Sequence, residues 1–128
     1  MNLIEIIEPA VLIRISKAFG SKMSENELYN SSRGRWKLNP SIAKKADFAI
    51  VIHKGIIKEV YEISDWQPAT KDSGLNISGD YSGRYEFIGK LAADEIRKKY
   101  KRESVKHYFK RGNSNPINYI NIKQNGLK

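Results

Sequence analysis

The fold is decided by one stretch in the middle of the chain, Asp47-Phe48-Ala49-Ile50-Val51-Ile52-His53-Lys54-Gly55-Ile56-Ile57-Lys58-Glu59-Val60-Tyr61-Glu62-Ile63. The apolar run that ends at Ile52 predicts a buried strand. The part from Ile56 onward is rich in β-branched and aromatic residues and predicts a second strand. Because only His53, Lys54 and Gly55 separate them, the two strands are expected to form a hairpin with a tight turn.

The other elements are predicted outward from this hairpin. Strands are expected at residues 11–15, 35–38, 84–90 and 116–122, with a short one at 105–109. The capping-box pattern Ser24–Glu27 predicts a short helix, Asn39-Pro40 begins a second, and residues 91–101 form the best helix. A loop rich in Ser, Gly, Asp and Pro spans residues 64–83, and the tail after Ile122 is expected to fray.

The order of these elements predicts the fold class. Strands outnumber helices, and the hairpins imply mostly antiparallel pairing. The chain of 128 residues is therefore expected to form a single α+β domain with its core at about residues 10–122. We expect a small curved, mostly antiparallel sheet or pseudo-barrel with flanking helices.

The composition of the chain argues against several classes of protein. There is no Cys, which excludes disulfides, thiol chemistry and cysteine metal sites. The longest apolar run is too short for a membrane span, and the acidic N-terminus is unlike a secretory signal. The chain is therefore expected to be cytoplasmic. The two histidines lie outside any metal-binding or catalytic motif, so no cofactor, metal or catalytic residue is predicted.

The net charge of +9 is concentrated in parts of the chain. Residues 97–111 hold eight Lys or Arg and one acid, interleaved with aromatics. Such a stripe is typical of a surface that meets phosphates. A solvated helix end is the plainer interpretation, and a membrane surface is less favoured because no long apolar helical face accompanies the bases.

Three basic or aromatic segments could form a ligand site. Their arginines and lysines would contact phosphates or base edges, their indoles would stack on a ring, and their Ser and Asn would bond its edge. The candidates are Ser32, Arg33, Arg35, Trp36, Lys37, Trp66, Lys110, Arg111 and Asn115. The alternatives remain open: each Trp could fill the core, and the segment around Asn115 could be an ordinary turn.

A resemblance adds to these patterns. The runs Asn26–Leu38, Ala46–Tyr61, Trp66, Arg84–Gly89 and Asn115–Asn121 resemble small prokaryotic and phage proteins of the PUA-like superfamily, which includes the ASCH, EVE and YTH domains. The resemblance covers roughly residues 10–122. It implies a pseudo-barrel with a cleft for RNA or a modified base, and some ASCH members hydrolyse modified nucleosides.

The sequence therefore predicts a nucleic-acid or nucleotide-binding module that recognises a base in an aromatic and basic cleft. One alternative is a phage or defence-related protein that sequesters a small nucleotide signal. Another is a hydrolase of modified nucleosides using Glu86, Lys54 or His53. A protein-interaction module is the last, and the oligomeric state stays open.

Overall fold

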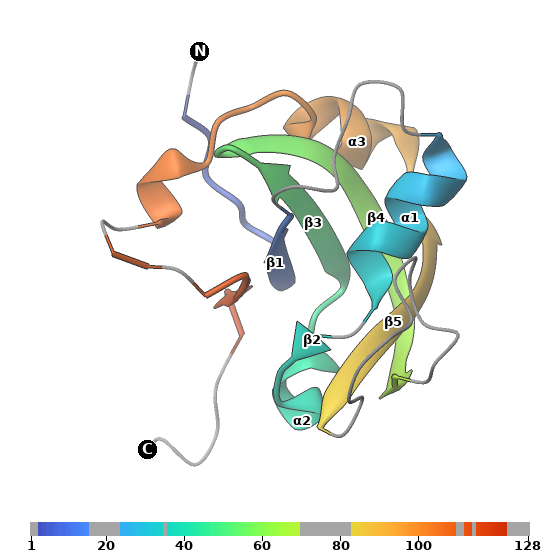
Figure 1. The fold of residues 1–128 in the computed structure, drawn as a ribbon. Helices are drawn as coiled ribbons and strands as arrows, with labels where there is room; N and C mark the ends of the chain where they lie inside the picture. The colour runs from blue at the N-terminus through green and yellow to red at the C-terminus, as the bar shows by residue number, and fades with distance from the viewer. Residues whose placement is uncertain are drawn as a thin grey trace.

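The computed structural model describes residues 3–15, 24–34, 36–69, 83–109, 112–113 and 115–122 (Figure 1). It is a small α+β domain in which a six-stranded mixed sheet curls until it is nearly closed, with short helices against it. The elements in chain order are β1 (Ala10–Arg14), α1 (Glu25–Arg33), β2 (Trp36–Lys37), α2 (Pro40–Ala43), β3 (Phe48–His53), β4 (Ile56–Pro68), β5 (Arg84–Leu91), α3 (Asp94–Tyr100), the 3₁₀ turn η1 (Lys106–Tyr108) and β6 (Ile117–Ile120). The predicted fold class is confirmed.

The central hairpin forms as predicted. β3 and β4 pair antiparallel, with His53 opposite Ile56 at the turn. Lys54 and Gly55 both adopt positive φ, 53° and 80°. This combination is the hairpin turn whose twist matches that of the flanking strands.

The strand order β2-β5-β4-β3-β1-β6 brings distant parts of the chain together. β1 runs parallel to β3, and the other neighbouring strands pair antiparallel. Because the sheet curls, its two edge strands, β6 and β2, come close to each other. The backbone N–H of Asn39, just after β2, donates to the hydroxyl of Tyr119 in β6 at 2.9 Å. One hydrogen bond thus links the two ends of the sheet.

Each face of the sheet has its own apolar core, as the alternation of strand side chains requires. Val11 and Ile13 of β1 face inward with Tyr61 and Phe87, and α1 and α2 cover that side. Leu12 and Ile50 face the other way, where α3 and the N-terminal segment cover them. α3 and α1 consequently flank the β4–β5 region from different sides (Figure 1).

Three sequence expectations need correction. The loop expected from Ser64 is strand as far as Pro68, because β4 continues to pair with β5 there; residues 70–82 lie outside the described part. The strand expected at 105–109 is the 3₁₀ turn η1, in which Phe109 N–H bonds back to Lys106. The helix expected from Leu91 begins at Asp94, because Leu91 still pairs with Tyr61 in the sheet. The tail expected to fray, residues 123–128, lies outside the described part.

Within the described residues, none of the helices has the length and apolar character that a membrane span requires.

Candidate functional site

The segment 32–37, predicted to touch a ligand, is largely engaged with the protein itself. Ser32 is fully buried, and its hydroxyl donates to the Leu28 carbonyl at 2.7 Å. Trp36 is half-buried, and its indole N–H donates to the Ser32 carbonyl at 2.7 Å. Arg33 forms an ion pair with the buried Glu86, which also accepts from Gln67. These contacts tie the end of α1 to the β4–β5 ribbon.

Trp66 belongs to the core rather than to a surface. It is 3% exposed and meets Phe87 edge-to-face at 5.6 Å between ring centroids. Its indole N–H is buried and has no hydrogen-bond partner among the described residues. Trp36 packs against the same core cluster. Both indoles therefore contact the same core cluster. Because Trp66 is buried there, it cannot stack on a ligand.

Of the remaining candidates, the two that the structure describes lie on different elements. Lys37 is exposed on the edge strand β2. Asn115 forms the turn before β6, where its side chain accepts from Ile117 N–H and its carbonyl accepts from Arg14. Arg35, Lys110 and Arg111 lie outside the described residues.

The residues named for hydrolysis are not brought together. Lys54 and His53 adjoin the start of β4. Glu86 of β5 lies opposite Gln67, which is eleven residues beyond Ile56, the first residue of β4. At about 3.3 Å per residue the separation is roughly 35 Å along the strand. No common active site can form from this set.

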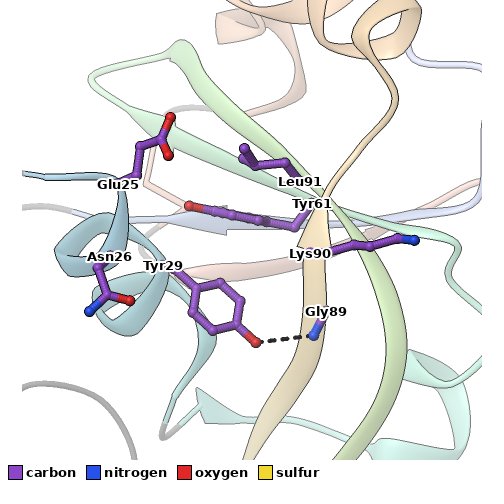
Figure 2. A pocket seen from close by; sticks show the side chains of 7 residues that line it. All are labelled: Glu25, Asn26, Tyr29, Tyr61, Gly89, Lys90 and Leu91. Atoms are coloured by element: carbon purple, nitrogen blue, oxygen red, sulfur yellow. Dashed lines mark hydrogen bonds between the residues drawn. The ribbon is translucent and has the colours of Figure 1, made fainter.

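The structure instead presents a hollow of about 260 Å³ between α1 and the β4–β5 pair, here called the tyrosine hollow (Figure 2). α1 contributes Glu25, Asn26 and Tyr29, and β4 contributes Tyr61. The end of β5 supplies Gly89, Lys90 and Leu91. The capping box fixes the α1 side, since Ser24 Oγ accepts from Glu27 N–H and Glu27 accepts from Ser24 N–H.

Two tyrosines shape the wall of this hollow. Their rings meet edge-to-face with centroids 5.3 Å apart. The Tyr29 hydroxyl accepts from the Gly89 N–H at 3.0 Å, which joins α1 to β5. At Gly89 the backbones of β4 and β5 approach so closely that a Cβ would lie 2.3 Å from the Glu62 carbonyl oxygen. Only glycine permits this approach.

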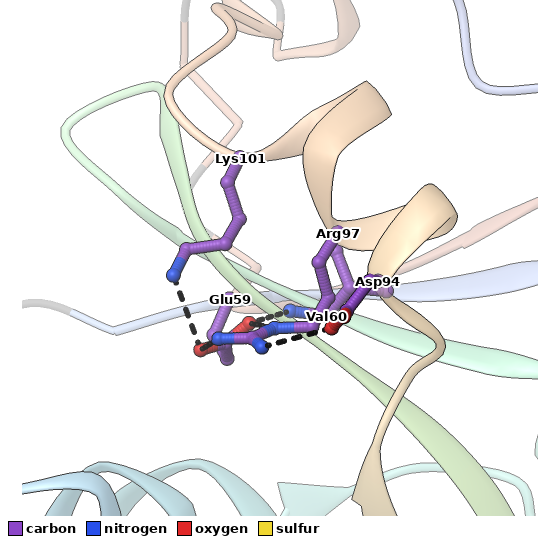
Figure 3. Close-up of polar contacts among 5 residues, drawn as sticks. All are labelled: Glu59, Val60, Asp94, Arg97 and Lys101. Atoms are coloured by element: carbon purple, nitrogen blue, oxygen red, sulfur yellow. Dashed lines mark hydrogen bonds and ion pairs between the residues drawn. The ribbon is translucent and has the colours of Figure 1, made fainter.

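A second hollow, of about 430 Å³, lies along α3 and is here called the basic hollow. Figure 3 shows three of the residues that line it, Asp94, Arg97 and Lys101, with their polar contacts to Glu59. It is lined by Asp94 and by four bases: Arg97, Lys98, Lys101 and Arg102. Lys98 and Arg102 are exposed. The side chains at these positions are therefore available to an anionic ligand.

Glu59 of β4 anchors two of these bases. Its carboxylate is buried and accepts from Arg97 at 2.8 and 3.0 Å and from Lys101 at 3.4 Å. Burial by itself would raise the pKa of Glu59, but the hydrogen bonds from Arg97 and from its own strand, with the charge of Lys101, hold it below its usual value. The result is a fixed guanidinium–carboxylate pair in which Arg97 lines the hollow.

The two hollows have no lining residue in common, but their residues lie near one another along the chain and interact through charge. Glu59 and Tyr61 stand two residues apart on β4, and Leu91 and Asp94 are three apart where β5 leads into α3. Burial, followed by the charges of Glu59 and Glu25, raises the pKa of Tyr61 far above its usual range. The pKa of Arg97 is raised chiefly by its bond to Glu59, with a smaller contribution from Glu25. Glu25 therefore lies within electrostatic reach of both hollows.

Only part of this site could be predicted from the sequence. The basic residues of α3 belong to the charge stripe at 97–111, and the capping box correctly marked the start of α1. Tyr29 and Tyr61 were missed, because apolar periodicity assigns both to the core. The signal that could have found them is a tyrosine hydroxyl placed on a core-facing position, where a polar end needs a partner.

No family model matches the chain, and neither the curated proteins nor the solved structures contain a significant match to it. Among the described residues, no group of three His, Asp or Glu is placed to hold a metal ion.

Proposed function

We propose that this protein is a nucleic-acid or nucleotide-binding module that holds a base in the tyrosine hollow and phosphates on the basic hollow. The observation that carries the proposal is that Glu25 interacts through charge both with Tyr61 of the aromatic hollow and with Arg97 of the cationic one, so the two lie within electrostatic reach of each other. Nucleotides present the same two chemistries side by side, a flat polar ring and an anionic backbone. The net charge of +9 favours such a ligand over a cationic one.

The PUA-like resemblance is part of the same proposal, because a nearly closed sheet with flanking helices is the architecture that it implies. So is the cytoplasmic location, where nucleotides and nucleic acids are abundant. A protein that sequesters a small nucleotide is the second candidate, and the modest size of the tyrosine hollow favours it.

The test is binding of fluorescent single-stranded RNA, single-stranded DNA and duplex DNA at about 50 mM and 200 mM salt. We expect measurable affinity at the lower salt and a steep loss at the higher. Lys98→Ala should weaken binding and lower the slope of log K against log salt by about one. The matched control is Lys44→Ala, which removes an exposed lysine at the end of α2, away from both hollows.

Mononucleotides separate the two candidates. A mononucleotide at 100 times its dissociation constant should stabilise a sequestering protein by about 2.7 kcal/mol in thermal unfolding, whereas a polymer binder should respond to oligonucleotides far more strongly. Absence of binding to every probe at low salt would contradict both candidates. If Lys98→Ala and Lys44→Ala changed binding equally, the phosphates would not be bound at α3.

A further inference from the structure

One polar group of the tyrosine hollow belongs to a side chain that is otherwise held in the core. Tyr61 is 3% exposed, and it is one of the residues that line the hollow. In Figure 2 its hydroxyl is directed toward the side of α1 where Glu25 and Asn26 lie. The core fixes the position of this side chain, so its hydroxyl can donate to a ligand atom in the hollow from a defined direction.

The hydrogen-bonding character of the wall is specific. Glu25 offers a carboxylate, which only accepts. Tyr61 remains a neutral phenol, because burial raises its pKa, and so offers a donor. Tyr29 also retains its hydroxyl hydrogen as a donor, since its oxygen already accepts from Gly89. The wall thus places an acceptor pair beside donors.

Resting on the proposed function, we propose that the tyrosine hollow selects a guanine base, whose ring N–H and amino group donate to Glu25 and whose carbonyl accepts from Tyr61. Guanine carries two adjacent donors next to an acceptor on this edge. Adenine and cytosine each present a ring-nitrogen lone pair beside their amino group, and Glu25 would repel it. Uracil has a single ring donor and no amino group, so it can donate only one of the two hydrogen bonds that the Glu25 carboxylate can accept from guanine.

Size and charge agree with this assignment. Pockets for drug-sized ligands hold about 300–1,000 Å³. A hollow of about 260 Å³ therefore suits one ring system, with the sugar and phosphate left outside. The outer part then meets the basic hollow, whose exposed bases Lys98 and Arg102 are suited to an anion. Glu25 could also bind an ammonium group, but the positive charges of Lys98 and Arg102 would repel such a ligand.

The experiment measures the affinity of the protein for GMP, IMP, AMP, CMP and UMP by titration calorimetry at low salt. Guanine should bind roughly 5- to 150-fold more tightly than adenine, the range expected for one bidentate pair. IMP keeps the ring N–H and the carbonyl but lacks the amino group, so its affinity should fall between the two.

Two variants locate the base. Glu25→Gln and Tyr61→Phe should each reduce the preference for GMP over AMP by at least about 5-fold. The matched controls are Glu62→Gln, which changes an exposed carboxylate of β4, and Tyr85→Phe, which removes the hydroxyl of a half-buried tyrosine of β5. Both controls should keep the wild-type preference. Urea unfolding of all four variants verifies that each is folded.

The outcomes distinguish this inference from the proposed function. Equal affinity for all nucleotides, with the salt and Lys98 effects intact, overturns the guanine assignment and leaves the binding module standing. A guanine preference that survives both Glu25→Gln and Tyr61→Phe places the base elsewhere and also overturns it. Absence of binding to any nucleotide or oligonucleotide overturns both.

Discussion

At the scale of single residues, the buried carboxylate of Glu59 shows how the basic hollow is organised. The side chain is 5% exposed, while its partners Arg97 and Lys101 are 22% and 33% exposed. The carboxylate is thus removed from water and depends on them, whereas they can still reach solvent. Glu59 therefore holds two cations in place while leaving their outer sides open to a ligand.

This pair predicts a pH dependence of stability. Because the folded pKa of Glu59 lies below its ordinary value of 4.5, its contribution is complete above that value and is lost as the pH falls through the lowered pKa. Glu59→Gln should cost about 1–3 kcal/mol near neutral pH, and the difference from wild type should shrink below about pH 4. Urea unfolding at both pH values measures it.

The control for this prediction is Glu62→Gln on the same strand. Its side chain is exposed, so its small effect should not depend on pH in this way. If the deficit of Glu59→Gln were the same in acid as at neutral pH, the ionised pair would not be the source of the stabilisation.

At the scale of elements, α1 is the part on which the tyrosine hollow depends. The helix is nine residues long, too short to be stable in isolation. Its capping box and its packing against β5 hold it, and its first turn supplies Glu25 and Asn26 to the hollow. Fraying of that turn would displace both side chains without touching the strands.

We predict that Ser24→Ala lowers the free energy of unfolding by about 1 kcal/mol, because the Glu27 N–H loses its acceptor. It should also weaken nucleotide binding, since Glu25 follows directly. Ser24→Thr is the matched control, because threonine keeps a hydroxyl that can accept from the Glu27 N–H, and it should lose less stability than Ser24→Ala. Thermal unfolding and the binding titration report the two effects. Equal behaviour of the two variants would show that the cap is not what positions the first turn.

At the scale of the whole molecule, the sheet is nearly closed, and side chains rather than strand pairing bridge its ends. Tyr119 of β6 reaches the backbone N–H of Asn39 beyond β2. Asn39 also caps α2, where its side chain accepts from Ser41 N–H. The hydrogen bond between Tyr119 and Asn39 therefore links β6 to α2, the helix that packs on the same core cluster as Val11 and Ile13.

Removing this link should have a small but localised effect. Tyr119→Phe should cost about 0.5–1 kcal/mol, because water can replace the lost acceptor at an exposed site. Hydrogen exchange of the Asn39 amide should accelerate by more than that of the β3–β4 amides. In Tyr85→Phe, which deletes a hydroxyl without deleting this bond, the Asn39 amide should keep its wild-type rate. Unchanged protection of Asn39 in Tyr119→Phe would mean that the sheet ends are held together by other contacts.

The local structure could be predicted from neighbouring residues alone. The hairpin at residues 47–63 followed from two apolar runs around a turn that tolerates positive φ, and the start of α1 followed from Ser24 and Glu27. Both depend on interactions between residues close in the chain. The α+β class followed from counting such elements, and the positive charge of α3 was visible as a stripe.

Which side chains face a ligand depends on contacts between distant parts of the chain. After Tyr61 and Ile63, strict alternation would turn Asp65 inward and leave Trp66 outside. The register shift between Ile63 and Asp65 reverses that order and buries Trp66 in the core. The tyrosine hollow likewise joins Tyr29, Tyr61 and Gly89 from three separate elements. A bulge and a long-range contact both arise from the pairing of distant strands, and no local pattern of residues encodes that pairing.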